Sequence, residues 1–273
     1  MSHFTVCVIT KDGDYEKALA PYDEEIQVEP YIRETKAQII QKVKDRKVRY
    51  EKDIARGEKD SWFEEHYGNV NWNDDESIHA AYVELWKEDE KFDEEGNELT
   101  TYNPKSKWDW YSLGGRWGGT LKLKEGAEII KDSEPSLIYP SYIQGGYTDF
   151  AQVKDIDFSP NKEAKKHAER FWDINVLGKP IESEEEKKEY WTPYNKKYYK
   201  DQYGSKKEYV RCQIELMTYA FIYEDKWYEP GEMGWFGCSD ATKDSYKEYR
   251  KIFREVLAKL SPEDYIAVVD CHI

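Results

Sequence analysis

Three side chains near the ends of the chain could do acid–base chemistry. Asp270 and His272 are separated by one residue, and His3 lies near the other end. Residues two apart on a strand share a face, so Asp270 and His272 should point the same way. If the first and last strands are antiparallel neighbours, His3 lies close to His272, and the three could divide acid–base work or hold a divalent metal ion. The alternative is that His272 caps a chain end and Asp270 accepts backbone hydrogen bonds.

A glycine-rich aromatic loop is the second candidate. The stretch NPKSKWDWYSLGGRW ends at Trp117, and two more glycines follow. Glycines let backbone N–H groups approach a ligand, an Arg offers a planar fork for phosphate or carboxylate, and indoles stack on bases. The candidate ligand-binding residues are Trp108, Trp110, Tyr111, Gly114, Gly115, Arg116 and Trp117. The alternative is a tight turn between two strands, with its aromatics in the core and Arg116 in an ordinary ion pair.

A second loop has a similar composition. The residues PGEMGWFG (230–237) contain Glu232 as a candidate site carboxylate and Trp235 as a candidate aromatic contact. Two such loops could form two walls of one pocket. A β-bulge or turn with a core Trp is the structural alternative.

The elements that must position these residues are strands at both ends of the chain. HFTVCVIT (3–10) and DYIAVVDCHI (264–273) are typical of buried strands. Residues 210–237 predict one or two more strands with a hairpin at 224–226. DSYKEYRKIFREVLAKL (244–260) places its apolar residues on one helical stripe.

The middle of the chain predicts charged helices, over residues 31–56, 77–91, 161–172 and 183–190. We therefore predict an α+β fold in a single domain over 1–273. Its central sheet is mostly antiparallel and is formed by the N- and C-terminal strands. Residues 31–99 and 161–209 are predicted helical insertions, packed on the sheet or inserted into it.

The amino-acid composition argues against some classes of function. The formal net charge is −15, which disfavours non-specific binding to nucleic acid and to anionic membranes. Ten Trp and 23 Tyr indicate a folded chain, since disordered chains are poor in aromatics. Four Cys without a CxxC pair, no signal peptide and no apolar run of about 20 residues predict a cytoplasmic protein with reduced, buried thiols.

Five blocks carry a resemblance that spans the chain: SHFTVCVI, LAPYDE, NPKSKWDWYSLGGRWGG, PGEMGWFG and VVDCHI. With them the sequence resembles a widespread group of uncharacterised proteins of tailed bacteriophages and some bacteria. The resemblance implies a phage-encoded accessory protein of the host cytoplasm, acting on the host or its immunity. It implies no catalytic residues.

Three functions follow from these observations. The first is a pocket protein that binds a phosphorylated or nucleotide-like small molecule, either sequestering it or hydrolysing it. The second is an acidic inhibitor or decoy that docks on a basic host defence protein through its Trp and Tyr patches. In the third, both loops are structural. Whether the protein is an enzyme stays open, because spacing alone does not fix catalytic geometry.

Overall fold

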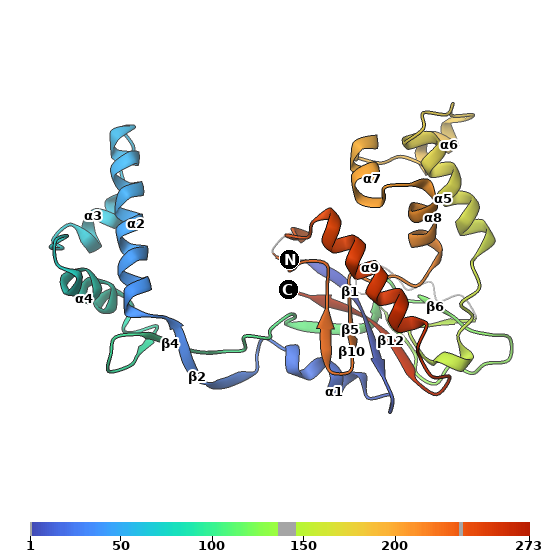
Figure 1. The fold of residues 1–273 in the computed structure, drawn as a ribbon, viewed down its shortest axis with the longest axis horizontal. Helices are drawn as coiled ribbons and strands as arrows, with labels where there is room; N and C mark the ends of the chain where they lie inside the picture. The colour runs from blue at the N-terminus through green and yellow to red at the C-terminus, as the bar shows by residue number, and fades with distance from the viewer. Residues whose placement is uncertain (1, 136–145, 235–236) are drawn as a thin grey trace. The chain divides into compact units, whose positions relative to one another are not determined.

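The computed structural model describes residues 2–135, 146–234 and 237–273. The chain divides into two compact units (Figure 1). The first comprises Met1–Glu24 with Lys105–Ile273, and the second comprises Glu25–Pro104. Both ends of the chain therefore belong to the first unit, and the second contains the whole of the predicted insertion at 31–99.

The first unit is built on a mixed sheet that contains seven strands in its described residues. In order they are β11 (Lys226–Tyr228), β10 (Ala220–Tyr223), β1 (His3–Thr10), β12 (Tyr265–His272), β5 (Trp110–Gly115) and β7 (Glu134–Pro135), while β9 (Phe150–Gln152) also pairs with β12. The two terminal strands, β1 and β12, are antiparallel neighbours at its centre, in the register that places His3 opposite His272. Parallel pairing is confined to β1 with β10 and to β5 with β7 among these strands. The predicted α+β fold is confirmed.

One face of this sheet carries the first hydrophobic core. Val6 and Val8 of β1 and Val269 of β12 are buried there. The short helices α1 (Tyr15–Leu19) and η1 (Ala20–Tyr22), which follow β1 directly, cover this face with Tyr15, Leu19 and Tyr22. The helices that cover this face are therefore close in sequence to the strand that they cover.

Helix α9 (Lys243–Leu257) covers the other face (Figure 1). Thr242 and Ser245 form a capping box at its start, which satisfies orphan N–H groups of the first turn. Its Phe253 is fully buried and stacks on Phe221, with ring centroids 4.7 Å apart. Full burial of one such side chain stabilises the fold by about 2–3 kcal/mol.

The face under α9 changes from apolar to polar along the central strands. Its β1 residues run Ile9, Cys7, Thr5, His3, and its β12 residues run Ile266, Val268, Asp270, His272. The alternation of side chains is uninterrupted, so the polar residues are held by the same backbone that buries the apolar ones. The rigid centre of the sheet thus positions the predicted acid–base residues.

Small elements and a helical subcluster complete the first unit. Strands β6 (Leu121–Lys122) and β8 (Tyr147–Thr148) pair with each other, and η2 (Val153–Asp155) follows β9. Helices α5 (Lys162–Asn175), α6 (Glu184–Glu189), α7 (Lys196–Tyr203) and α8 (Lys206–Ile214) follow in order. Trp172, Tyr199 and Tyr209 are buried in the core that these helices share. The prediction of a strand over Val210–Ile214 is wrong, because these residues end α8.

The second unit has its own small core. It comprises β2 (Gln27–Glu34), β3 (Lys91–Phe92) and β4 (Glu98–Tyr102), with α2 (Lys36–Ala55), α3 (Ser61–Tyr67) and α4 (Asp75–Trp86). Ile39, Phe63 and Ile78 from the three helices are buried together. The predicted helix over 31–56 is corrected at its start, since residues 31–34 belong to β2.

None of the helices in the described ranges is long and apolar enough to cross a membrane. All four cysteines are free, but only Cys7 and Cys271 are buried, while Cys238 is exposed. Burial raises the pKa of the Cys7 and Cys271 thiols, which keeps them protonated.

Candidate functional site

His3 is bound to a buried carboxylate. Its Nδ1 lies 2.9 Å from Oδ1 of Asp270, whose side chain is only 2% exposed. A carboxylate can only accept a hydrogen bond, so Nδ1 of His3 carries the proton. Nε2 of a neutral His3 is then a lone pair, and it can take up a proton without breaking the bond to Asp270.

His272 forms a second pair of the same kind. Its Nδ1 donates to the carboxylate of Asp109, at 2.6 Å from Oδ1 and 2.8 Å from Oδ2. Nε2 of His272 is buried and has no hydrogen-bond partner among the residues that the structure describes. A buried polar atom without a partner costs about 1–3 kcal/mol, so folded proteins retain few of them. This nitrogen is therefore a candidate for contact with a ligand.

The two imidazoles and one indole form a single cluster. The His3 and His272 rings are 4.9 Å apart between centroids, at 70°. Trp110, opposite His272 on β5, stacks on His272 at 5.1 Å and 17°, and meets His3 edge-on at 5.1 Å. Trp110 is 45% exposed, so part of its indole is accessible from solvent. We call His3, Asp109, Trp110, Asp270 and His272 the histidine cluster.

The glycine loop after β5 is held by two buried carboxylates. Asp149 accepts the N–H groups of Gly119 and Thr120 at 2.7 and 2.8 Å, and Asp270 accepts the N–H of Arg116 at 3.0 Å. These N–H groups are thus bound internally and do not form an open cradle for an anion. The sequence alternative in which Asp270 accepts a backbone bond therefore holds, alongside its bond to His3.

Gly114 and Gly115 permit this close approach. Their φ angles are +75° and +51°, which disfavour residues with a Cβ. A Cβ on Gly114 would lie 2.3 Å from Oδ2 of Asp149, and one on Gly115 would lie 2.4 Å from Cβ of Asp270. These two glycines are required by the turn and position Arg116 beside Asp270.

Replacing Gly115 with alanine is therefore expected to lower the free energy of unfolding by about 2–3 kcal/mol, from the positive φ and the clash together. Gly126→Ala is the matched control: its φ is +83°, but no atom lies within 4 Å of the added Cβ. It should cost only about 1 kcal/mol. Urea unfolding measures both, and equal losses would mean that the contact with Asp270 is unimportant.

Arg116 and Trp117 are the residues of this loop whose side chains reach solvent and could contact a ligand. The Arg116 side chain is half-buried, and no ion pair or hydrogen bond of its guanidinium occurs in the described part of the chain. Trp117 is 40% exposed. The ordinary ion pair of Arg116, which was the structural alternative, is thus absent from these residues.

Trp108 and Tyr111 lie in the hydrophobic core on the opposite face of the sheet. Trp108 is 6% exposed, and its indole N–H donates to the carbonyl of Leu19 at 3.3 Å. Tyr111 packs edge-on against Trp108 at 5.0 Å, and burial raises the pKa of its hydroxyl to about 12. Both side chains pack in this core, on the face of the sheet away from the histidine cluster, so neither is a proposed ligand contact.

The second loop lies against the start of β1. The hydroxyl of Ser2 donates to the carbonyl of Gly234 at 3.0 Å and accepts the N–H of Gly237 at 2.5 Å. Glu232 is largely exposed, 3.7 Å from Nζ of Lys107. The predicted contact Trp235 lies outside the described residues. Both loops therefore reach the ends of β1 and β12 that hold the histidine cluster.

Two carboxylates of this region were not predicted from the sequence as site residues. Asp109 binds His272 and Asp149 binds the glycine loop, and both are as important to the geometry as Asp270. Asp109 lies between Trp108 and Trp110, so its position within the aromatic block is the only signal that could have indicated it. Within the described residues, no group of three or more His, Cys, Asp or Glu side chains could hold a metal ion.

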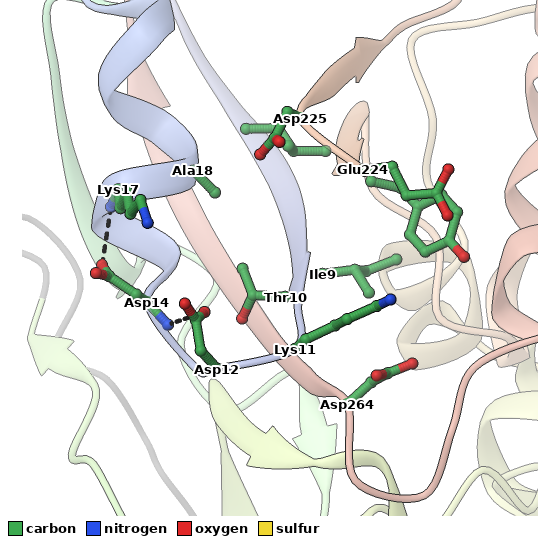
Figure 2. Close-up of a pocket in the computed structure, with 12 residues that line it drawn as sticks. Ile9, Thr10, Lys11, Asp12, Asp14, Lys17, Ala18, Glu224, Asp225 and Asp264 are labelled. Atoms are coloured by element: carbon green, nitrogen blue, oxygen red, sulfur yellow. Dashed lines mark hydrogen bonds between the residues drawn. The ribbon is translucent and has the colours of Figure 1, made fainter.

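A cavity of about 560 Å³ lies at the other end of the central strands (Figure 2). Thr10, Lys11 and Asp264 line it near the end of β1 and the start of β12, and Glu224 and Asp225 come from the β10–β11 hairpin. Its five carboxylates outnumber its two lysines. None of the predicted site residues lines it, and its negative charge disfavours a phosphorylated ligand.

No family model matches the chain, and no curated protein or solved structure matches it. The function must therefore be argued from the site itself.

Proposed function

We propose that the protein binds a phosphorylated or nucleotide-like small molecule at the histidine cluster and hydrolyses it. The observation that carries the proposal is the pair of imidazoles, each bound at Nδ1 to a carboxylate, with no hydrogen bond of either Nε2 among the described residues. Two such imidazoles with rings 4.9 Å apart can serve as acid and base around one reacting atom.

The chemistry divides between the two rings. A neutral imidazole accepts the proton of an attacking water at Nε2 while the water oxygen bonds to phosphorus. The protonated imidazole donates its Nε2 proton to the leaving oxygen as the P–O bond breaks. Asp109 and Asp270 hold the rings in the required tautomer and stabilise the imidazolium that forms. The sequence leaves open which His is the base.

Trp110 and Arg116 are the proposed binding groups. The exposed indole offers a stacking surface for a base beside His272, and such stacking contributes about 1–3 kcal/mol per base. Arg116 directly follows the glycine pair, and its backbone N–H is bonded to Asp270, so its guanidinium is the proposed partner of a phosphate.

Thermal-shift screening against nucleotides, cyclic nucleotides and sugar phosphates identifies the ligand, since a compound that binds the native state raises the melting temperature. Release of phosphate or of a nucleoside from each hit then measures turnover. If no phosphorylated compound stabilises the protein, the proposal is wrong.

Replacing Arg116 with alanine is expected to weaken binding of such a ligand about 10- to 100-fold, because a charge-assisted hydrogen bond is lost. The melting temperature should change by no more than about 2 °C, since no described side chain depends on this guanidinium. Arg49→Ala, at an exposed Arg of α2, removes the same charge and should leave the Kd unchanged. Unfolding of the Arg116 variant would make the residue structural.

The wider role follows from the resemblance to phage proteins and stays a prediction. A phage-encoded protein that removes or sequesters a host signalling nucleotide would act against host defence. Expression of the wild type, but not of the Arg116→Ala variant, should then restore phage growth on a host whose defence depends on such a nucleotide.

A further inference from the structure

A second charged site lies between α9 and the connection of α7 to α8, at a cavity of about 450 Å³. Five of its lining residues are basic, Lys243, Lys247, Arg250, Lys251 and Arg254, and two are acidic, Glu208 and Glu248. This excess of positive charge stands in a chain of net charge −15. Helices α7, α8 and α9 are labelled in Figure 1. None of these residues belongs to the histidine cluster.

Arg250 is the buried cation of this cavity. Its side chain is 9% exposed, and one Nη donates to the carbonyl of Gln202 at 2.8 Å. Its Nε is buried and makes no hydrogen bond to any described residue, although it forms an ion pair with Oε1 of Glu208 at 3.5 Å. A desolvated guanidinium is stable only beside compensating negative charge. The cavity therefore has a donor that the described residues leave unused.

Glu208 is already bound to another residue. Arg254 donates to it at 2.9 Å and to Glu215 at 2.7 Å. Oε1 of Glu208 is thus shared between Arg254, at 2.9 Å, and the longer ion pair with Nε of Arg250, at 3.5 Å. A ligand oxygen in the cavity would supply the missing acceptor.

The lysines of α9 follow one helical stripe. Lys243, Lys247 and Lys251 are spaced four residues apart, so each faces the next one turn away. Like charges at this spacing destabilise a helix. Only Lys251 has an ion pair in the described ranges, at 3.6 Å from Glu248, and both of these side chains are mostly exposed. The stripe thus lowers helix stability unless an anion binds to it.

We propose that this cavity binds an oligophosphate, either free or carried by a nucleoside. The lysine stripe provides point charges along a chain of phosphates, and Arg250 provides a directed donor at the buried end. A volume of about 450 Å³ lies within the range of small-molecule sites. Because the whole molecule is acidic, oligophosphate would not accumulate at its surface without such a local site.

Isothermal titration with tripolyphosphate and with ATP, without added metal, tests the proposal. The wild type should bind tripolyphosphate, and the double variant Lys243→Gln/Lys247→Gln should bind it at least tenfold more weakly. Lys259→Gln, at an exposed lysine just beyond α9, removes one charge outside the cavity and should leave the Kd unchanged. Binding of ATP with the same sensitivity to the double variant indicates a nucleoside carrier, and binding of tripolyphosphate alone indicates the free anion.

Three results would overturn the proposal: no binding of tripolyphosphate at millimolar concentration, equal binding by wild type and double variant, or equal binding of sulfate. The Arg116→Ala variant, which should weaken ligand binding at the histidine cluster, separates this site from the proposed function. It should bind tripolyphosphate as the wild type does. If it loses tripolyphosphate binding while the lysine variant keeps it, the anion belongs to the histidine cluster and the α9 cavity is not a site.

Discussion

Replacing His272 with alanine is expected to lower turnover of the phosphorylated substrate by about 10²- to 10⁴-fold, the usual contribution of one general acid or base. Its Nε2 is buried and has no hydrogen-bond partner in the described part of the chain, and its Nδ1 is held by Asp109. Ligand affinity should change much less, because Trp110 and Arg116 remain. Steady-state kinetics with the substrate found by screening gives kcat and KM separately.

His167→Ala is the control for this experiment. His167 is half-exposed on α5, 3.6 Å from a carboxylate oxygen of Glu189, and takes no part in the cluster. Its kcat should equal that of the wild type. Asp109→Asn should lower kcat and shift the pH–rate profile, because a carboxamide no longer stabilises the imidazolium. Unchanged turnover in His272→Ala would remove His272 from the mechanism.

A protein that only sequesters its ligand would give a different pattern. It would show no turnover, and His272→Ala would alter only the Kd. The same two measurements therefore distinguish hydrolysis from binding.

Replacing Asp149 with alanine is expected to lower the free energy of unfolding by about 3–5 kcal/mol, the range for removing one partner of a buried charged network. The side chain is fully buried and accepts from Gly119 and Thr120 N–H and from the hydroxyl of Ser133 at 2.5 Å. All three donors lose this acceptor when the carboxylate is removed. Urea unfolding followed by circular dichroism measures the change.

Two further variants control for this effect. Asp132→Ala, at an exposed aspartate near Ser133 in sequence, should change stability by less than about 0.5 kcal/mol. Asp149→Asn keeps one acceptor oxygen but turns an NH₂ group toward donors, so its loss should be intermediate. If Asp149→Ala is as stable as the wild type, the glycine loop does not depend on this carboxylate.

The sequence predicts the centre of the fold well. HFTVCVIT and DYIAVVDCHI are β-branched, apolar and near the ends of the chain, and they form the central antiparallel pair with His3 opposite His272. The alternation of side chains then places Asp270 and His272 on one face, because a regular strand leaves no other choice. The proximity of His3 to His272 followed only on the condition that these two strands pair antiparallel, and the structure shows this pairing.

The environment of each loop aromatic was not predictable. Trp108 and Trp110 are two residues apart, yet Trp108 is in the core and Trp110 stacks on His272. Trp108 precedes β5 and bridges to Asp23, so strand alternation does not extend to it. Asp109 and Asp149 act through partners distant in sequence, and with 56 acidic residues in the chain their type carries little information.

The sequence before helix α8 contains a helix N-cap signal that the strand prediction did not use. Ser205 caps the helix by accepting the N–H of Glu208, in the S-x-x-E pattern typical of helix starts. The strand prediction for VRCQI conflicts with this start signal. The start signal at Ser205 lies five residues before the misassigned segment.

The tautomers of His3 and His272 test the central claim most directly. Long-range ¹H–¹⁵N spectra of the histidine rings, with and without the ligand found by screening, report which nitrogen carries the proton. We predict protonated Nδ1 and a free Nε2 lone pair on both neutral rings, with the Nε2 signals moving when the ligand binds. Protons on Nε2 of the neutral rings, or a ligand that leaves both Nε2 signals in place, would contradict the account.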